Sequence, residues 1–359
     1  MMLDTSIKLT FVGDICPADM RFTKGFGLNS KFIKGEGIKW EKNLKELTKS
    51  SDIAFCNLEA PLIPSEKFDS DYHFAGTLAF ADFIKRSGFD IVSIANNHIL
   101  EEGIEGFNST IKQLDKSKIK YIGKYDDESS NIEIITIKEK RIGFVAFNAV
   151  DLEKINNPKL FAEFSEKSVF KALDNLNELN VDYKIFSFHW GNEYINIPSR
   201  NQIEFAHKLI DSGVNIIVGH HSHVIQPIEE YNKGLIIYSL GNCLFDSTHS
   251  VNTKHGLCIK VKINEGITYS SIDLKLSNLG VMRDDSLTAK KRFDIINSNF
   301  SNLVQRNNYN KIYKKLTKKN RFRERINMKK LLIRNIILGR FKDKSKLLRN
   351  VFNFYINRK

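Results

Sequence analysis

Three histidines within four residues follow the apolar segment at residues 214–218. An apolar run of this length predicts a buried strand, and the chain then continues as Gly-His-His-Ser-His over residues 219–223. Alternate residues of an extended chain face the same side, so we expect His221 and His223 to point into one pocket, and His220 to point away or to contact only the rim. The stretch therefore predicts a strand that delivers imidazoles to the edge of a sheet.

Four other predicted strands also end in polar side chains. The residues that follow their apolar segments are Asp14, Glu59, the pair Asn97 and His98, and His189. Segments with helical spacing lie between these strands, and this order is typical of α/β proteins, in which ligands bind at strand ends. From residue 225 onward, four segments alternate like antiparallel strands. We therefore expect two stacked sheets with helices outside them.

The side chains at these strand ends suit divalent transition metals. Carboxylate, amide and imidazole groups are ligands for Zn²⁺, Mn²⁺ or Fe²⁺, and a shared carboxylate such as Glu59 would bridge two ions. Other roles stay open for single residues. A lone histidine is more often structural, Asp14 would also suit a turn or a helix cap, and Asn97 would suit a turn. The clustering at strand ends favours a site for one or two metal ions.

Charge divides the chain into two parts. Residues 281–359 contain 23 Lys and Arg against 5 Asp and Glu, whereas residues 1–280 contain 32 against 37. Such a shift is a common sign of a boundary between units. We therefore predict an α/β domain over residues 1–280 and a basic helical extension over residues 281–359.

The ends of the chain and its cysteines bear on location. The first residues show no basic segment followed by a long apolar one, and no run approaches the 18 apolar residues of a membrane span. The four cysteines are scattered without a CxxC pair, as expected of buried thiols in a reducing compartment. We expect the protein to be cytoplasmic, either free or bound at the inner face of the membrane.

Six motifs occur in a fixed order over residues 7–245. They are Gly-Asp (13–14), Asn-Leu-Glu (57–59), Ala-Asn-Asn-His (95–98), His-Trp-Gly-x-Glu-Tyr (189–194), Gly-His-His-x-His-Val-x-Gln-Pro (219–227) and Tyr-Ser-Leu-Gly-Asn (238–242). Together they resemble the CapA family of capsule-synthesis proteins, which is similar in turn to the calcineurin-like metallophosphatases. The resemblance implies a four-layer α/β/β/α sandwich with a metal site between its loops.

The resemblance also implies a role for each site residue. Asp14 would bind one metal ion and Glu59 would bridge two, while Asn97 and His189 would serve the second ion. His221 and His223 would complete the ligand set. His98 would be an unligated histidine that acts as a general acid or stabilises developing charge.

Three positions bear on how far the resemblance extends. The metallophosphatase pattern has a histidine two residues after the first aspartate, and this chain has Cys16 there. A thiolate would suit zinc, whereas a neutral buried thiol would leave the first ion with one ligand fewer. Glu59 replaces the usual aspartate, a change that CapA-like sequences share, and Glu101 keeps the acidic character expected after His98.

The resemblance implies a part in making a bacterial surface polymer, either poly-γ-glutamate or a capsular polysaccharide. We expect a metal-dependent hydrolase that cleaves a phosphoester or amide bond of a polymer or of a phosphorylated small molecule. A bound metal ion would lower the pKa of a water molecule and so supply the nucleophile. The alternative is a non-catalytic scaffold subunit of a membrane-associated capsule synthesis complex.

The basic C-terminal part has its own alternatives. Lys and Arg alternate with apolar residues over 311–330, and segments 331–338 and 347–356 have helical spacing. Basic charge beside an apolar stripe suits an anionic membrane surface or capsule synthesis proteins. Helices docked on the chain's own domain are a further possibility. Nucleic acid is not favoured, because no nucleic-acid-binding motif accompanies the charge.

Overall fold

Two stacked sheets organise the computed structural model, which describes residues 5–69, 72–126, 129–151, 160–246, 249–277 and 280–338. The first sheet has the order β18 (Gly280–Arg283), β17 (Ile267–Ser277), β16 (His255–Ile263), β1 (Ile7–Ile15), β2 (Ile53–Leu58), β5 (Ile91–Ser93) and β6 (Lys120–Ile122). The short strand β15 (Asn242–Leu244) also pairs with β1.

The second sheet has the order β13 (Ile228–Tyr231), β14 (Gly234–Ile237), β12 (Ile216–His220), β11 (Tyr183–His189), β10 (Lys140–Asn148) and β9 (Glu133–Ile137). Two small sheets pair β3 (Leu62–Ile63) with β4 (Gly76–Thr77), and β7 (Tyr125–Asp126) with β8 (Ser129–Ser130). Strands β1, β2, β5 and β6 run parallel to one another, and so do β10, β11 and β12. The carboxyl ends of these strands therefore lie along one edge of each sheet.

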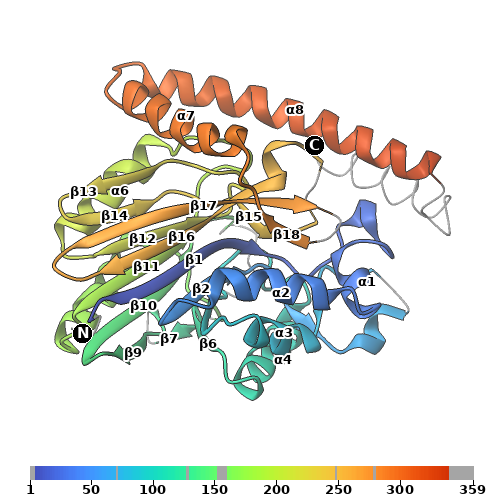
Figure 1. Cartoon of the computed structure of the whole chain (residues 1–359), viewed down its shortest axis with the longest axis horizontal. Coiled ribbons are helices and arrows are strands. Elements are labelled where there is room, and N and C mark those ends of the chain that lie inside the picture. Colours follow the sequence, from blue (N-terminus) through green and yellow to red (C-terminus); the bar gives the residue numbers. More distant parts are fainter. Residues whose placement is uncertain are drawn as a thin grey trace.

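Helices cover the outer faces of both sheets (Figure 1). Against the first sheet lie α2 (Gly37–Thr48), α3 (Ala79–Arg86) and α4 (Gly103–Lys116), with α1 (Leu28–Ile33) and the 3₁₀ turns η1 (Arg21–Thr23) and η2 (Ser65–Asp69) nearby. Against the second lie α5 (Glu166–Glu178) and α6 (Arg200–Asp211). The turn η4 (Asn252–Lys254) precedes β16. This arrangement confirms the predicted four-layer α/β/β/α sandwich.

The alternation of side chains along each central strand explains the layers. In β10, Phe144 packs in the core between the two sheets, whereas its neighbours Val145 and Phe147 pack against the outer helices. Such a strand is buried on both faces, which is why its sequence is a continuous apolar run. Phe55 of β2 stacks on Phe144 across the sheets, with ring centroids 6.5 Å apart.

The last two helices pack on this sandwich. Phe293 and Ile296 of α7 (Leu287–Val304) join the core between the sheets, and Tyr309 of α8 (Tyr309–Ile337) joins the core beneath α5 and α6. The predicted boundary at residue 280 coincides with the first residue of β18, which pairs with β17; the division into domains stays a prediction. The predicted helical segment 347–356 lies outside the described residues.

No helix in the described ranges is both long and apolar enough to cross a membrane.

Gly13 allows β1 and β15 to approach closely just before Asp14. A Cβ atom at Gly13 would lie 1.9 Å from the carbonyl oxygen of Gly241, whose partner is the Asp14 amide at 3.0 Å. We expect Gly13→Ala to lower the free energy of unfolding by about 1–3 kcal/mol, the usual cost of overpacking. Urea denaturation measures this loss. Gly266→Ala is the matched control, because a Cβ atom there meets nothing within 4 Å; equal stability of the two variants would contradict the explanation.

Candidate metal centre

The ends of four strands bring polar side chains to one place. In the first sheet Asp14 of β1 lies beside Asn57 of β2, and in the second sheet His189 of β11 lies beside His220 of β12. Glu59 follows β2 by one residue. All five side chains are buried, with at most 1 % of their surface exposed. Polar groups so deeply buried need hydrogen-bond partners, and here these side chains mostly bond to one another.

Asp14, Glu59 and His223 form the first group of ligand atoms. Each offers an atom within 4.8 Å of the others. His223 directs Nε2 toward Glu59 Oε1 at 3.6 Å, while its Nδ1 donates to Asn242 Oδ1 at 3.1 Å. A metal-binding histidine usually donates its second ring nitrogen in this way, which fixes the ring and its tautomer.

Asn97, His189 and His221 form a second group. His189 Nε2 lies 2.9 Å from Asn97 Oδ1 and 3.2 Å from His221 Nδ1. Burial, followed by the charge of His221, lowers the pKa of His189 well below its ordinary value. Burial also lowers the pKa of His221, to about 4. Both imidazoles are therefore neutral near pH 7, the state in which they bind metal.

Glu59 lies between the two groups. Its Oε1 atom is 3.6 Å from His223 Nε2 and 3.8 Å from His189 Nε2, and it has no hydrogen-bond partner among the described residues. Burial, together with the charge of Asp14, raises the pKa of Glu59 well above its usual range. A cation beside Oε1 would reverse this effect and favour the ionised form. The residues present thus fit a divalent cation.

Asp14 is compensated by the protein itself. Burial alone would raise its pKa, but hydrogen bonds with His220 and His223 hold the pKa well below the ordinary value. His220 Nδ1 donates to Asp14 Oδ1 at 2.9 Å, and Asn57 Nδ2 donates to the same oxygen at 3.0 Å. The other oxygen, Oδ2, faces His223 Nδ1 at 3.5 Å. The His221 amide also donates to Oδ2, at 3.4 Å. Both contacts of Oδ2 are longer than those of Oδ1, so Oδ2 is the atom better placed for a ligand role.

The expectation that His220 points away from the site or contacts only its rim is wrong. It assumed an extended chain through residue 223, but β12 ends at His220, and the backbone φ angles are +87° at His221 and +55° at His223. The chain turns here, so period-two alternation fails. All three histidines consequently reach the site, with His220 bonded to Asp14.

Two further residues had no role in the sequence interpretation. Asn57 Nδ2 approaches both Asp14 and Glu59, the latter at 3.3 Å. Asn242 orients His223 and is itself held by donation of Nδ2 to Thr253 O at 2.9 Å. Both asparagines stand in recurring polar motifs at strand ends, and that position was the signal that could have identified them.

His98 lies at the edge of this cluster. Its Nδ1 is 2.9 Å from Glu101 Oε1, and Phe74 packs on its ring at a centroid distance of 4.6 Å. Its neighbour in the chain, Asn97, contacts His189 of the second group. Because Glu101 accepts from Nδ1, Nε2 is the nitrogen left to face a substrate. The catalytic role of His98 stays a prediction.

Cys16 is buried in a small apolar cluster with Ala18, Ala60 and Phe245. Burial and then the charge of Glu59 raise the pKa of the thiol well above its ordinary value. The neutral thiol is therefore favoured over the thiolate. Among the described residues, Cys16 is not in the group of ligand atoms around Asp14.

Helix α8 packs against the loop that follows β11. Asn320 Nδ2 donates to Tyr194 O at 3.1 Å, and Glu324 Oε2 lies 3.5 Å from His249 Nε2. The ring of Tyr194 lies 5.4 Å from that of His249 and 6.1 Å from that of His223. The C-terminal helix is thus connected to the cluster through Tyr194.

The fold and this cluster define a four-layer α/β/β/α protein with a candidate metal centre at the strand ends. Residues 8–247, which include every residue of the two ligand groups, match the family described as "Bacterial capsule synthesis protein PGA_cap". The chain belongs to this family, and the predicted resemblance to the CapA family is confirmed.

Similar proteins include two from Bacillus. The "Capsule biosynthesis protein CapA" of Bacillus anthracis is 31% identical over 219 residues, which cover 57% of this chain and 53% of that protein. The chain thus spans about half the length of that relative. The "PGA biosynthesis protein CapA" of Bacillus subtilis is 26% identical over 303 residues, which cover 80% of this chain and 77% of that protein.

Two solved phosphoesterase-type structures align with much of this chain. The calcineurin-like phosphoesterase YfkN of Bacillus subtilis aligns with a TM-score of 0.48 and 14% identity, covering 84% of this chain and 99% of that chain. The 5′-nucleotidase precursor of Thermus thermophilus aligns with a TM-score of 0.47 and 15% identity, covering 84% of this chain and 60% of that chain.

The buried neutral imidazoles predict acid sensitivity of the metal-free protein. The pKa of His221 and that of His249 are each lowered to about 4, mainly by burial, against about 6.5 for an exposed histidine. Between these values each of the two imidazoles binds more protons in the unfolded chain than in the folded one, so its contribution to stability falls as pH falls from about 6.5 toward 4. Urea denaturation in the presence of a chelator measures the slope. We expect a shallower slope for His221→Asn, and equal slopes would contradict the assignment.

Proposed function

We propose that this protein is a metal-dependent hydrolase that acts in the synthesis of a bacterial surface polymer. The observation that carries the proposal is the position of Glu59 Oε1, which is buried without a hydrogen-bond partner among the described residues, between two groups of ligand atoms. A carboxylate shared by two ligand groups is the arrangement that suits two-metal hydrolysis.

Six residues would hold the metal ions. Asp14, Glu59 and His223 would bind one ion, while Asn97, His189 and His221 would bind a second, with Glu59 shared between them. Mixed oxygen and imidazole ligands suit Mn²⁺, Zn²⁺ or Fe²⁺. Bound there, such ions would polarise the scissile bond and lower the pKa of a water molecule.

The remaining site residues orient these groups and handle a proton. His220 and Asn57 fix the Asp14 carboxylate by donating to Oδ1, and Asn242 fixes the ring of His223. His98, with Nδ1 held by Glu101, would donate a proton from Nε2 to the leaving group.

The substrate class in the proposal comes from the relatives. Proteins named for capsule and PGA biosynthesis are similar to this chain, which supports a polymer such as poly-γ-glutamate or a capsular polysaccharide, and a phosphoester or amide bond as the target. In this proposal the protein acts in the cytoplasm, either free or bound at the inner face of the membrane.

A non-catalytic scaffold is the second candidate, and Cys16 favours it. A neutral buried thiol where the metallophosphatase pattern has a histidine leaves the Asp14 group with fewer ligands than a hydrolase of that type would have. In that case the protein would keep its fold, and its metal site in part, as a subunit of a capsule synthesis complex.

Metal content tests the ligand assignment. Purified wild-type protein, reloaded with Mn²⁺ or Zn²⁺ and dialysed, should retain one or two equivalents by elemental analysis. The double variant His221→Ala/His223→Ala should retain at most about a tenth of that amount, because each ligand group loses an imidazole. The control His73→Ala/His207→Ala removes two histidines that pair with Glu102 and Glu229, outside the ligand groups. Equal metal in the wild type and the site variant would contradict the assignment.

Hydrolysis assays separate the enzyme from the scaffold. Metal-loaded protein should hydrolyse at least one member of a panel of phosphomonoesters, phosphodiesters and γ-glutamyl peptides. His98→Ala should reduce the rate by about 10²-fold or more, the usual contribution of a general acid, without loss of metal, and His207→Ala should not. No turnover of any class, or an unchanged rate in His98→Ala, would favour the scaffold.

A further inference from the structure

Helix α8 has a polar face that is buried and contacts the sandwich. Asn320 donates to the carbonyl of Tyr194, and Asn335 Nδ2 donates to Phe22 O at 3.1 Å. Glu324, the one acidic residue of the helix, is only 1 % exposed. These contacts fix the rotation of α8 about its axis, and so determine which residues face outward.

The outward face contains four apolar residues in a row. The spacing along the chain is four, seven and four positions, which places all of them on one face of the helix. The residues are Phe322, Ile326, Ile333 and Ile337. Their exposed fractions are 68%, 37%, 57% and 77%. We call these four residues the apolar stripe. It extends for about 22 Å at 1.5 Å per residue.

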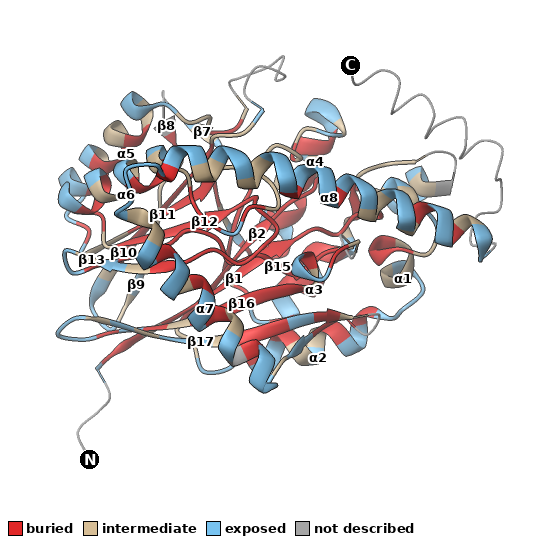
Figure 2. Ribbon diagram, turned by 90° about the horizontal axis from the view of Figure 1, so that it is seen from above, coloured by how far each residue is buried: buried red, intermediate tan, exposed pale blue. Residues whose placement is uncertain are grey.

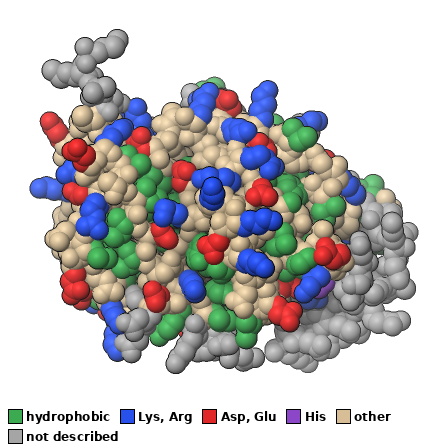
Figure 3. Space-filling model, turned by 90° about the horizontal axis from the view of Figure 1, so that it is seen from below, with side chains coloured by type: hydrophobic (Ala, Val, Ile, Leu, Met, Phe, Trp, Pro, Cys, Tyr) green, Lys and Arg blue, Asp and Glu red, His purple; other side chains and the backbone are tan. Residues whose placement is uncertain are grey.

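Basic side chains surround the apolar stripe. Helix α8 contains eleven Lys and Arg, all of them exposed, and Figure 2 shows the helix crossing the molecule with most of its visible surface exposed. Since the whole chain has a net charge of +13, α8 alone accounts for ten of these charges. Figure 3 shows the opposite face of the molecule, where basic and acidic side chains are interspersed. The concentration of basic residues on α8 thus contrasts with the mixed charge of that face.

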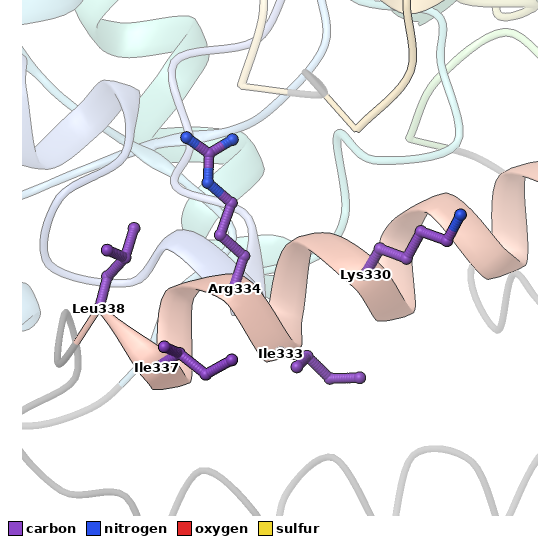
Figure 4. Close-up of a pocket in the computed structure, with 5 residues that line it drawn as sticks. All are labelled: Lys330, Ile333, Arg334, Ile337 and Leu338. Atoms are coloured by element: carbon purple, nitrogen blue, oxygen red, sulfur yellow. The ribbon is translucent and has the colours of Figure 1, made fainter.

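The last turns of α8 show the two kinds of side chain together. In Figure 4, Ile333 and Ile337 point to the side of the helix opposite Arg334. Lys330 and Leu338 line the same shallow hollow as these residues. The apolar stripe is thus at the surface, with charged groups beside it.

We propose that the outward face of α8 binds the surface of an anionic lipid bilayer. The apolar stripe would enter the boundary between headgroups and acyl chains, and the Lys and Arg residues beside it would attract anionic headgroups. A soluble polyanion would account for the charge but not for four exposed apolar residues in line. The inference is independent of the proposed hydrolase, because none of the residues in the stripe contacts the metal centre.

This binding would also orient the candidate metal centre. The polar face of α8 contacts Tyr194, whose ring lies 6.1 Å from that of His223. A protein held on the bilayer through the outward face would keep the two ligand groups beneath the same helix, close to the membrane surface.

Vesicle sedimentation with the full-length protein tests the proposal. We expect wild-type protein to sediment with phosphatidylcholine vesicles that contain about one third phosphatidylglycerol, and not with phosphatidylcholine alone, and salt should weaken the binding. Phe322→Ser/Ile333→Ser/Ile337→Ser should lower the apparent affinity at least about tenfold. Lys318→Glu/Arg325→Glu should do the same, since two attractive charges become repulsive.

A matched control removes apolar residues exposed elsewhere. Ile38→Ser/Ile104→Ser/Leu179→Ser changes side chains that are 78%, 49% and 43% exposed on or beside α2, α4 and α5, and it should bind like the wild type. Circular dichroism and metal content verify folding, and the single variant Ile337→Ser is the fallback if the triple variant misfolds.

Several results would overturn the proposal. One is no binding of the wild type to anionic vesicles. Another is unchanged binding of the stripe variants, the result expected if the basic residues bind a soluble polyanion, or if residues 339–359 or a second copy of the chain cover the stripe.

Discussion

The burial of two carboxyl groups in one site is the constraint on which the rest of the structure depends. Moving an ionised carboxylate out of water costs several kcal/mol unless partners replace the lost hydration. Asp14 has such partners in His220, Asn57 and His223, and its pKa is correspondingly low. Glu59 accepts from Asn57 through Oε2, but its Oε1 has no hydrogen-bond partner among the described residues, and the pKa of Glu59 is raised, first of all by burial. A cation beside Glu59 would remove this difference, because it would favour the ionised form of the carboxyl group.

The backbone is shaped to place these groups. Strands β1 and β2 lose their regular register between Phe11 and Asp14, and Gly13 lets β15 approach there. On the second sheet, His221 and His223 adopt positive φ angles that cost roughly 1–2 kcal/mol each in a residue with a Cβ atom. Unfavourable backbone at a cluster of buried histidines is what a functional site shows when the surrounding fold holds it in place.

Much of this could be predicted from the sequence because it follows from local pattern. Strands that are buried on both faces appear in the sequence as continuous apolar runs, and these runs identified the strands. The polar positions at their ends then pointed to Asp14, Glu59 and His189, which the structure brings together. The contact between His220 and Asp14 could not be predicted, because it depends on a turn that breaks the alternation of an extended strand. Nor could charge composition reveal that Asn320 of the basic C-terminal region contacts Tyr194 and that Glu324 contacts His249, since those contacts depend on tertiary packing.

Electron paramagnetic resonance of Mn²⁺-loaded protein tests the central role of Glu59 most directly. If Glu59 joins two ligand groups, saturating Mn²⁺ should give the spectrum of two magnetically coupled ions in the wild type. Glu59→Gln should give only the six-line spectrum of isolated Mn²⁺, because the neutral amide cannot serve as a bridging carboxylate. An isolated Mn²⁺ spectrum in the wild type, or the same coupled spectrum in both proteins, would contradict a centre built around Glu59.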